Sequence, residues 1–158
     1  MATASTVFVD TNVLVYADDA REDDKRPIAR AWLEKLWLER RGRTSQQVLN
    51  EYYAVATRKL AANVTRGDAR AEVRRYQHWQ PWAVDHQTVE TAWALEARFG
   101  ISWWDSLMVA AALHQGCEWL LTEDLQHDQR IDGLRIVNPF LVDPAVLDHP
   151  PPEPAAKP

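Results

Sequence analysis

The sequence lacks several features that define whole classes of protein. It has one cysteine, Cys117, so no disulfide can form within the chain and a reducing compartment is expected. Its longest apolar run falls far short of the roughly 18 residues that a membrane span needs, and its N-terminal residues lack the basic region of a secretory signal. We therefore expect a cytoplasmic protein with no membrane association.

The pattern of zinc ligands is also missing. The lone cysteine has no partner at the C-x-x-C spacing, and the five histidines are scattered along the chain. Structural and catalytic zinc sites are built mainly from such Cys and His groups at short spacings. No zinc site is expected.

The composition is that of a globular domain, with 158 residues, 46% of them hydrophobic and 26% charged. A net charge of −5 is unusual for a protein that binds nucleic acid, because Lys and Arg make most phosphate contacts. Basic stretches nevertheless occur at residues 40–43 and 70–75. The charge therefore neither excludes nor favours an RNA or DNA partner.

Short apolar segments alternate with amphipathic ones along the chain. Residues 6–9, 117–122 and 134–138 are mostly apolar, as are strands that are covered on both faces in a parallel sheet. Helical periodicity is predicted over residues 27–40, 45–60, 65–79, 87–99 and 102–114. This alternation predicts an α/β fold with a parallel sheet.

The last segment has a different composition. Residues 143–158 hold six of the nine prolines and almost no large apolar residue. Such a composition is typical of disordered or polyproline-like segments. We therefore expect one domain over residues 1–142 and a disordered tail over residues 143–158.

Four carboxylates lie where the local pattern does not require a charge. Asp10 and Asp124 each follow a predicted strand, whereas Glu51 and Asp105 share a face with apolar residues of predicted helices. Each carboxylate also has an interpretation that needs no functional site. The three aspartates could cap helices, and Glu51 could lie at the exposed edge of its helix. Because the cleft of an open parallel sheet lies beyond the carboxyl ends of its strands, we expect the four to meet in one acidic pocket.

Such a pocket needs positive charge. Two carboxylates about 4 Å apart repel by about 4 kcal/mol at an effective dielectric constant of about 20, so the cluster must take up protons, spread apart or bind metal. Oxygen ligands favour hard cations such as Mg²⁺ or Mn²⁺. Two such ions about 3.5–4 Å apart are the arrangement used for in-line phosphodiester hydrolysis.

Four segments, taken together, resemble a known family. VFVDTNVLVYADD, QQVLNEYYAVATRKL, ISWWDSLMVAAALHQGCEWLLTEDLQ and IDGLRIVNPF resemble, in this order, a PIN-domain ribonuclease of the VapC toxin type over residues 6–140. The resemblance implies a three-layer α/β/α sandwich with a central, mostly parallel sheet. It also implies cleavage of single-stranded or loop RNA with Mg²⁺ or Mn²⁺, a homodimer, and a small antitoxin protein as partner.

The resemblance extends to single positions. The metal-binding and catalytic carboxylates of the family match Asp10, Glu51, Asp105 and Asp124. Hydroxyl and amide groups that orient these ligands or contact the substrate match Thr11, Asn12 and Thr122. Two more acids, Glu123 and Asp128, compete with Asp124 for the fourth position.

The leading hypothesis is thus a metal-dependent endoribonuclease that acts by two-metal hydrolysis as the toxin of a toxin–antitoxin pair. The alternative is a non-catalytic nucleic-acid-binding or regulatory module whose acidic site docks an arginine of a partner. A phosphatase with an aspartyl nucleophile is disfavoured, because such sites need a second aspartate two residues after the first and the chain has Asn12 there.

The chain has eight tryptophans, and unpaired bases stack well on such rings. Trp32, Trp37, Trp93 and Trp119 lie in amphipathic or apolar segments and are predicted to be core or dimer contacts. Trp103 and Trp104 flank Asp105, and packing is favoured for both over a place at the rim of the cleft.

Overall fold

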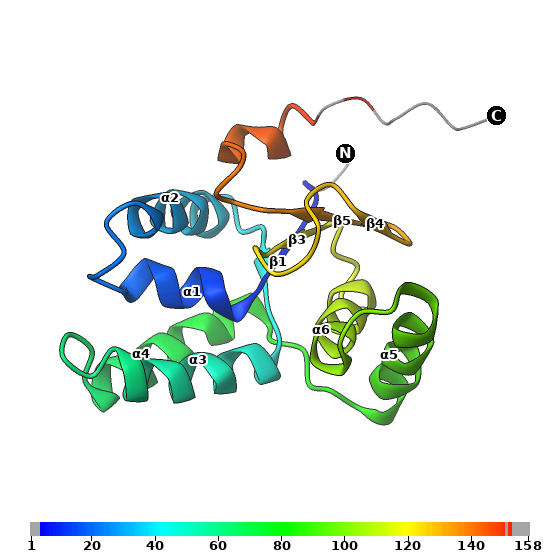
Figure 1. Ribbon diagram of the computed structural model, residues 1–158. Coiled ribbons are helices and arrows are strands. Elements are labelled where there is room, and N and C mark those ends of the chain that lie inside the picture. The colour runs from blue at the N-terminus through cyan, green and yellow to red at the C-terminus, as the bar shows by residue number, and fades with distance from the viewer. Residues whose placement is uncertain (1–3, 151, 153–158) are drawn as a thin grey trace.

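Across residues 4–150 and 152, which the computed structural model describes, the chain forms a five-stranded sheet in the order β2–β1–β3–β5–β4 (Figure 1). The neighbours β2 (Gly42–Arg43), β1 (Val7–Val9), β3 (Trp119–Leu121) and β5 (Leu134–Val137) are parallel, and β4 (Arg130–Ile131) is antiparallel to β5. Every residue of β1, β3 and β5 is buried. The predicted mostly parallel sheet is confirmed.

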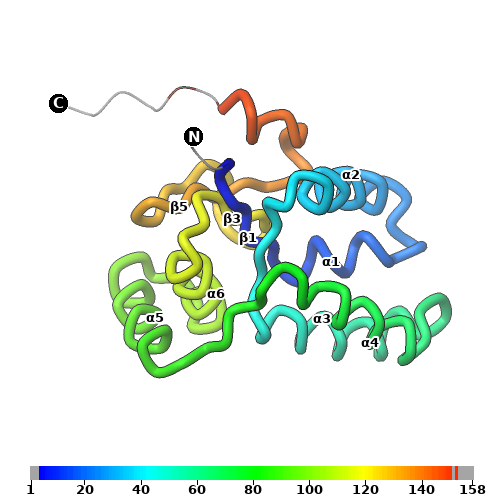
Figure 2. Tube along the Cα trace, turned by 180° about the vertical axis from the view of Figure 1, so that it is seen from behind, coloured from blue at the N-terminus to red at the C-terminus, as the bar shows by residue number. Residues whose placement is uncertain are grey.

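Helices connect the strands and cover the sheet. They are α1 (Thr11–Asp18), α2 (Lys25–Leu38), α3 (Gln46–Lys59), α4 (Arg66–Arg75), α5 (His86–Phe99) and α6 (Trp103–His114), with the 3₁₀ helices η1 (Tyr76–Trp79) and η2 (Pro144–Leu147). In Figures 1 and 2, α1 to α4 gather on one side of the molecule and α5 pairs with α6 on the other. The architecture is the expected three-layer α/β/α sandwich. None of the helices in the described ranges has both the length and the apolar character that crossing a membrane requires.

The edge strand β2 lies against an aromatic cluster formed by Trp37, Tyr76 and Trp79. The ring centroid of Trp79 lies 4.9 Å from that of Trp37 and 4.8 Å from that of Tyr76, and Trp79 is only 3% exposed. A Cβ atom at Gly42 would lie 2.3 Å from the Trp79 ring. The backbone can approach the ring this closely only because residue 42 is glycine.

We expect Gly42→Ala to lower the free energy of unfolding by about 2–3 kcal/mol, within the range for overpacking a core, because the other two rings hold Trp79 in place. Urea denaturation would measure the change. Gly133→Ala is the matched control, since a Cβ there meets no described atom within 4 Å. Equal denaturation midpoints for Gly42→Ala and the parent would show that the ring can move aside.

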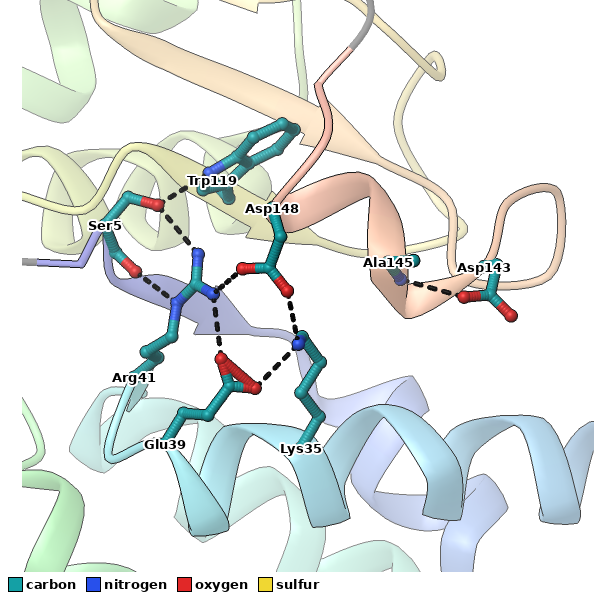
Figure 3. A network of polar contacts seen from close by, with 8 residues as sticks. All are labelled: Ser5, Lys35, Glu39, Arg41, Trp119, Asp143, Ala145 and Asp148. Atoms are coloured by element: carbon teal, nitrogen blue, oxygen red, sulfur yellow. Dashed lines mark hydrogen bonds and ion pairs between the residues drawn. The ribbon is translucent and has the colours of Figure 1, made fainter.

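The chain after β5 differs from the expectation of a disordered tail from residue 143. Asp143 caps η2, in which Leu147 is buried, and Asp148 forms ion pairs of 2.9 Å with Arg41 and 2.7 Å with Lys35 (Figure 3). Arg41 is 3% exposed and also donates to the carbonyl oxygen of Ser5 over 2.8 Å. Residues 143–148 are therefore packed on the domain. The rest of the predicted tail includes residues 151 and 153–158, which lie outside the described residues.

Candidate functional site

One cavity collects the four predicted carboxylates. It is bordered by α1, α3 and the first turn of α6, and its wall includes Asp10, Glu51, Asp105 and Asp124. Thr11, Asn12, Gln47, Lys59 and Trp104 also line it. Residues more than 100 positions apart in the sequence thus share one wall, as the pattern of acids predicted.

Asp10 lies at the junction between β1 and α1. Its Oδ1 caps α1 by accepting from the backbone N–H of Thr11 over 2.6 Å. Its Oδ2 accepts from the hydroxyl of Thr122 over 2.8 Å and from the amide of Asn12 over 3.2 Å. Asp10 is therefore both the helix cap that the local pattern suggested and a member of the site.

Burial raises the pKa of Asp10 to about 7, although the hydrogen bonds from Thr122 and Thr11 oppose this rise. The carboxylates of Asp124 and Asp105 raise it further. Only 7% of Asp10 is exposed, so water solvates its charge poorly. The site consequently holds an anion that is costly to keep ionised.

Asp124 is tied to Asp10 through two shared partners. Thr122, which is fully buried, accepts from the backbone N–H of Asp124 over 3.0 Å while it donates to Asp10. The amide of Asn12 donates to Asp124 Oδ2 over 3.0 Å. Among the described residues, the buried Oδ1 of Asn12 finds no hydrogen-bond partner, so the site also presents an unused oxygen acceptor.

Glu51 reaches the cavity from α3 and not from inside the core. It is exposed, and its carboxylate accepts from the hydroxyl of Thr11 over 3.0 Å and from the amide of Gln47 over 3.3 Å. The expectation that Glu51 shares the apolar, core-facing side of its helix is therefore wrong, because Glu51 lies at the exposed edge of that stripe, which was the local alternative. That edge faces the cavity, where Thr11 holds the carboxylate.

Asp105 lies in the first turn of α6. Its backbone N–H donates to Oγ of Ser102, the N-cap residue, over 3.1 Å. Burial raises the pKa of its carboxyl group, the hydrogen bond with the Ser102 side chain opposes the rise, and the nearby carboxylates of Asp124 and Glu51 add to it. The interactions reported for Asp10 and Asp105 thus link all four carboxylates electrostatically.

The two competing acids bind basic partners instead. Glu123 accepts a hydrogen bond from the Tyr16 hydroxyl and forms an ion pair of 2.8 Å with Lys25. Asp128 forms an ion pair of 2.9 Å with Arg135. Both carboxylates already have a counter-charge. Of these three acids, Asp124 is the one that lines the cavity.

The chemistry of these donors fits a hard divalent cation. The groups that hydrogen-bond to the four carboxylates are uncharged hydroxyl, amide and backbone N–H groups. The four candidate ligands all offer oxygen atoms, which hard cations prefer. As the side chains stand, the described part of the chain has no group of three or more His, Cys, Asp or Glu placed to hold a metal ion. Of the four carboxylates, those of Glu51 and Asp124 are exposed and are therefore the least restrained by packing.

Sequence reasoning missed four neighbours of the acidic side chains in and beside the cavity. Gln47 precedes Glu51 by four residues on α3, a spacing that places side chains together on a helix and was available as a signal. Lys25 and Tyr16 hold Glu123, and nothing local in the sequence indicates this contact. Trp104, for which packing was expected, lines the cavity instead.

Comparison with solved structures shows a similar fold in three other proteins or complexes. A toxin–antitoxin complex from Klebsiella pneumoniae matches with a TM-score of 0.61 and 20% identity over 85% of this chain and 98% of that one. VapC20 from Mycobacterium tuberculosis, described as a sarcin–ricin loop cleaving toxin, has a TM-score of 0.53 and 22% identity over 73% of this chain and 87% of its own. VapBC2 from Rickettsia felis, bound to a DNA fragment from its promoter, has a TM-score of 0.55 and 18% identity over 83% and 96% of the two chains.

Comparison of sequences gives the family. No curated protein sequence matches the chain significantly. The family model of the PIN domain matches residues 7–132, a range that runs from β1 to β4 and contains the four predicted carboxylates that line the cavity. The chain therefore belongs to the PIN domain family.

Proposed function

We propose that the protein is a metal-dependent endoribonuclease that acts as the toxin of a toxin–antitoxin pair. The observation that carries this proposal is the cavity that four carboxylates line, two of which, Asp10 and Asp105, have raised pKa values because of burial and of the other acids nearby. Membership of the PIN family supports it, and so does the likeness to a toxin described as cleaving the sarcin–ricin loop. The proposed substrate is single-stranded or loop RNA.

In this proposal, Mg²⁺ or Mn²⁺ is held by Asp10, Glu51, Asp105 and Asp124. A pair of such ions supplies an activated water and stabilises the leaving oxygen of a phosphodiester. The protein supplies the positioning: Thr122 and Asn12 orient the carboxylates of Asp10 and Asp124, and Thr11 with Gln47 orients Glu51.

Two basic residues lie on the wall of the same cavity, Arg21 and Lys59. Arg21 is paired with Asp19 at 2.9 Å. We propose that these cations contact the phosphates of RNA on either side of the one that is cleaved. They would offset part of the repulsion between an anionic backbone and the acidic site.

We propose a homodimer, a small cognate antitoxin and a cytoplasmic location. Two of the similar structures are toxin–antitoxin assemblies, which supports the antitoxin. The buried free thiol of Cys117 agrees with a reducing compartment.

Cleavage of RNA should require a divalent ion. We expect the purified protein to cut end-labelled RNA with Mg²⁺ or Mn²⁺, to lose this activity in EDTA, and to regain it when the ion is restored, because the carboxylates hold the ion that activates water. Denaturing gels of loop-containing and single-stranded RNAs would measure it. A nuclease-free preparation that binds a partner protein tightly but turns over no RNA with any metal would support the docking module instead.

A further inference from the structure

We propose that Trp104 is the base-stacking platform of the RNA site, on which an unpaired base next to the cleaved phosphate lies. The inference rests on the proposed function, since it assigns the part of that site that contacts the base. The substrate is then a strand with at least one base free to leave its stack.

Trp104 is exposed where its neighbour is packed. It is 62% exposed, which is the highest value among the eight tryptophans of the chain. Trp103 is half-buried, packs against the core and stacks on Trp93 with ring centroids 6.4 Å apart and an interplanar angle of 28°. Exposing a large aromatic surface forgoes the stabilisation that burial would give, so packing does not account for the ring at position 104.

The position of Trp104 ties it to the carboxylates. It immediately precedes Asp105 in the first turn of α6, and the two residues line the same cavity together with Asp10. A phosphate held by cations at these carboxylates would therefore lie beside the ring. The base attached to that nucleotide, or to the next one, is the part of RNA that can cover the ring.

Charge explains why such a platform is needed. The chain carries a net charge of −5, and six acidic residues line the cavity against two basic ones, Arg21 and Lys59, so the charge of the protein alone attracts RNA only weakly at this site. Stacking on an aromatic face is available to every base and needs no positive charge. It also requires an unstacked base, which discriminates against a continuous duplex.

The test measures binding, so that it does not depend on cleavage. Asp10→Asn is the parent, and fluorescence anisotropy of a labelled single-stranded oligoribonucleotide reports its affinity in Mg²⁺. The second probe is a chain of abasic ribose phosphates of the same length. Trp104→Ala and Trp104→Leu remove the ring, whereas Trp104→Phe keeps an aromatic face. Trp93→Ala removes another exposed tryptophan, 48% exposed and located on α5.

We expect Trp104→Ala and Trp104→Leu to weaken binding of intact RNA by about fivefold or more, from the stacking energy of one base. Trp104→Phe should lose less, Trp93→Ala should bind as the parent does, and the abasic chain should bind all variants equally. Circular dichroism checks that each variant is folded. If Trp104→Ala is not folded, the RNA affinities of Trp104→Leu and Trp104→Phe are compared instead.

Three results would overturn the platform: equal affinity of Trp104→Ala and the parent for intact RNA, equal losses on intact and abasic chains, or no binding of intact RNA by the parent. Cleavage by the wild-type protein tests the proposed function separately. Metal-dependent cleavage with no effect at position 104 keeps the nuclease and removes the platform. Binding that depends on the Trp104 ring, without metal-dependent cleavage, keeps the platform and removes the nuclease.

Discussion

Replacing Asp10 by asparagine should lower the rate of metal-dependent RNA cleavage by about 100-fold or more, the scale expected for loss of a metal ligand. The same change should stabilise the metal-free protein at pH 8. Asparagine caps a helix as well as aspartate does, so α1 keeps its N-cap. The substitution therefore removes the charge without removing the local structure that positions it.

The direction of the stability effect follows from the pKa of Asp10, which burial raises from 3.8 to about 7. Below pH 4 the group is protonated in both the folded and the unfolded chain, and its charge costs nothing. Between pH 4 and 7 only the unfolded chain ionises freely, so the cost grows with pH and reaches its full value above pH 7. At about 1.36 kcal/mol per pKa unit, this cost is about 4 kcal/mol.

Asparagine removes this cost but loses hydrogen bonds. Its amide nitrogen cannot accept from Thr122 and Asn12 as Oδ2 does, which costs about 1–2 kcal/mol. We therefore expect a net stabilisation of about 2–3 kcal/mol at pH 8 in EDTA, fading toward pH 4. Added Mg²⁺ should stabilise the wild type more than the variant, because a ligand that binds the native state shifts unfolding by mass action.

Urea denaturation at pH 8 and pH 5, with EDTA and with Mg²⁺, measures the stability, and gels of labelled RNA measure the rate. Asp128→Asn is the matched control. Asp128 lies four residues after Asp124, pairs with Arg135 and has a φ of 65°, which asparagine tolerates. Its variant should cleave as the wild type does. A rate for Asp10→Asn within about threefold of wild type would exclude Asp10 as a ligand, given the cost expected for losing one.

The fold was predictable wherever a segment carried its own signal. The apolar runs around Phe8, Leu120 and Ile136 became the three buried parallel strands. Gly100, with a φ of 65°, ends α5 where the sequence placed its end. By contrast, β2 and β4 have two residues each, too few for any periodicity, and only the pairing with β1 and β5 defines them.

The first part of the tail was missed for a different reason. Its prolines dominated the composition, but Leu147 and Asp148 each have a partner elsewhere: Leu147 packs in the core, and Asp148 pairs with Arg41. These contacts join residues about a hundred positions apart, so no local window reveals them. Composition predicts disorder only where such long-range contacts do not form.

The site was predictable as a set of residues but not as a geometry. Asp10 and Asp124 could be placed because parallel strands end at one edge of a sheet. The exposure of Glu51 depends on how far α3 is rotated about its own axis. The apolar stripe of this helix does not determine the rotation closely enough to decide whether a residue at the edge of the stripe is buried or exposed. The exposure of Trp104 depends on where α6 meets the cavity, since Trp103 beside it is packed.

Truncating Trp32 to alanine should lower the free energy of unfolding by about 3–5 kcal/mol, the range for large aromatic truncations in cores. Trp32 is fully buried on α2, and its indole Nε1 donates to the carbonyl oxygen of Pro139 over 3.1 Å. The truncation removes a large apolar volume and also leaves this carbonyl without its partner. A loss of this size is a large part of the roughly 5–15 kcal/mol that stabilises a typical domain.

Trp32→Phe separates the two effects, because it keeps an aromatic ring and loses the N–H donor. We expect an intermediate loss of about 1–3 kcal/mol, the cost of an unsatisfied buried acceptor. Urea denaturation followed by far-UV circular dichroism measures all variants without relying on tryptophan fluorescence. Equal losses for the alanine and phenylalanine variants would mean that the hydrogen bond to Pro139, and not the volume, determines the effect.

Trp104→Ala is the matched control for the Trp32 variants, because it removes a tryptophan that we assign to RNA binding. Its ring is 62% exposed, so its removal should change the free energy of unfolding by no more than about 0.5 kcal/mol. A loss comparable to that of Trp32→Ala would place the ring in the core and contradict the proposed platform. A small loss of stability with a large loss of RNA affinity would instead mean that this tryptophan contributes to binding and not to folding.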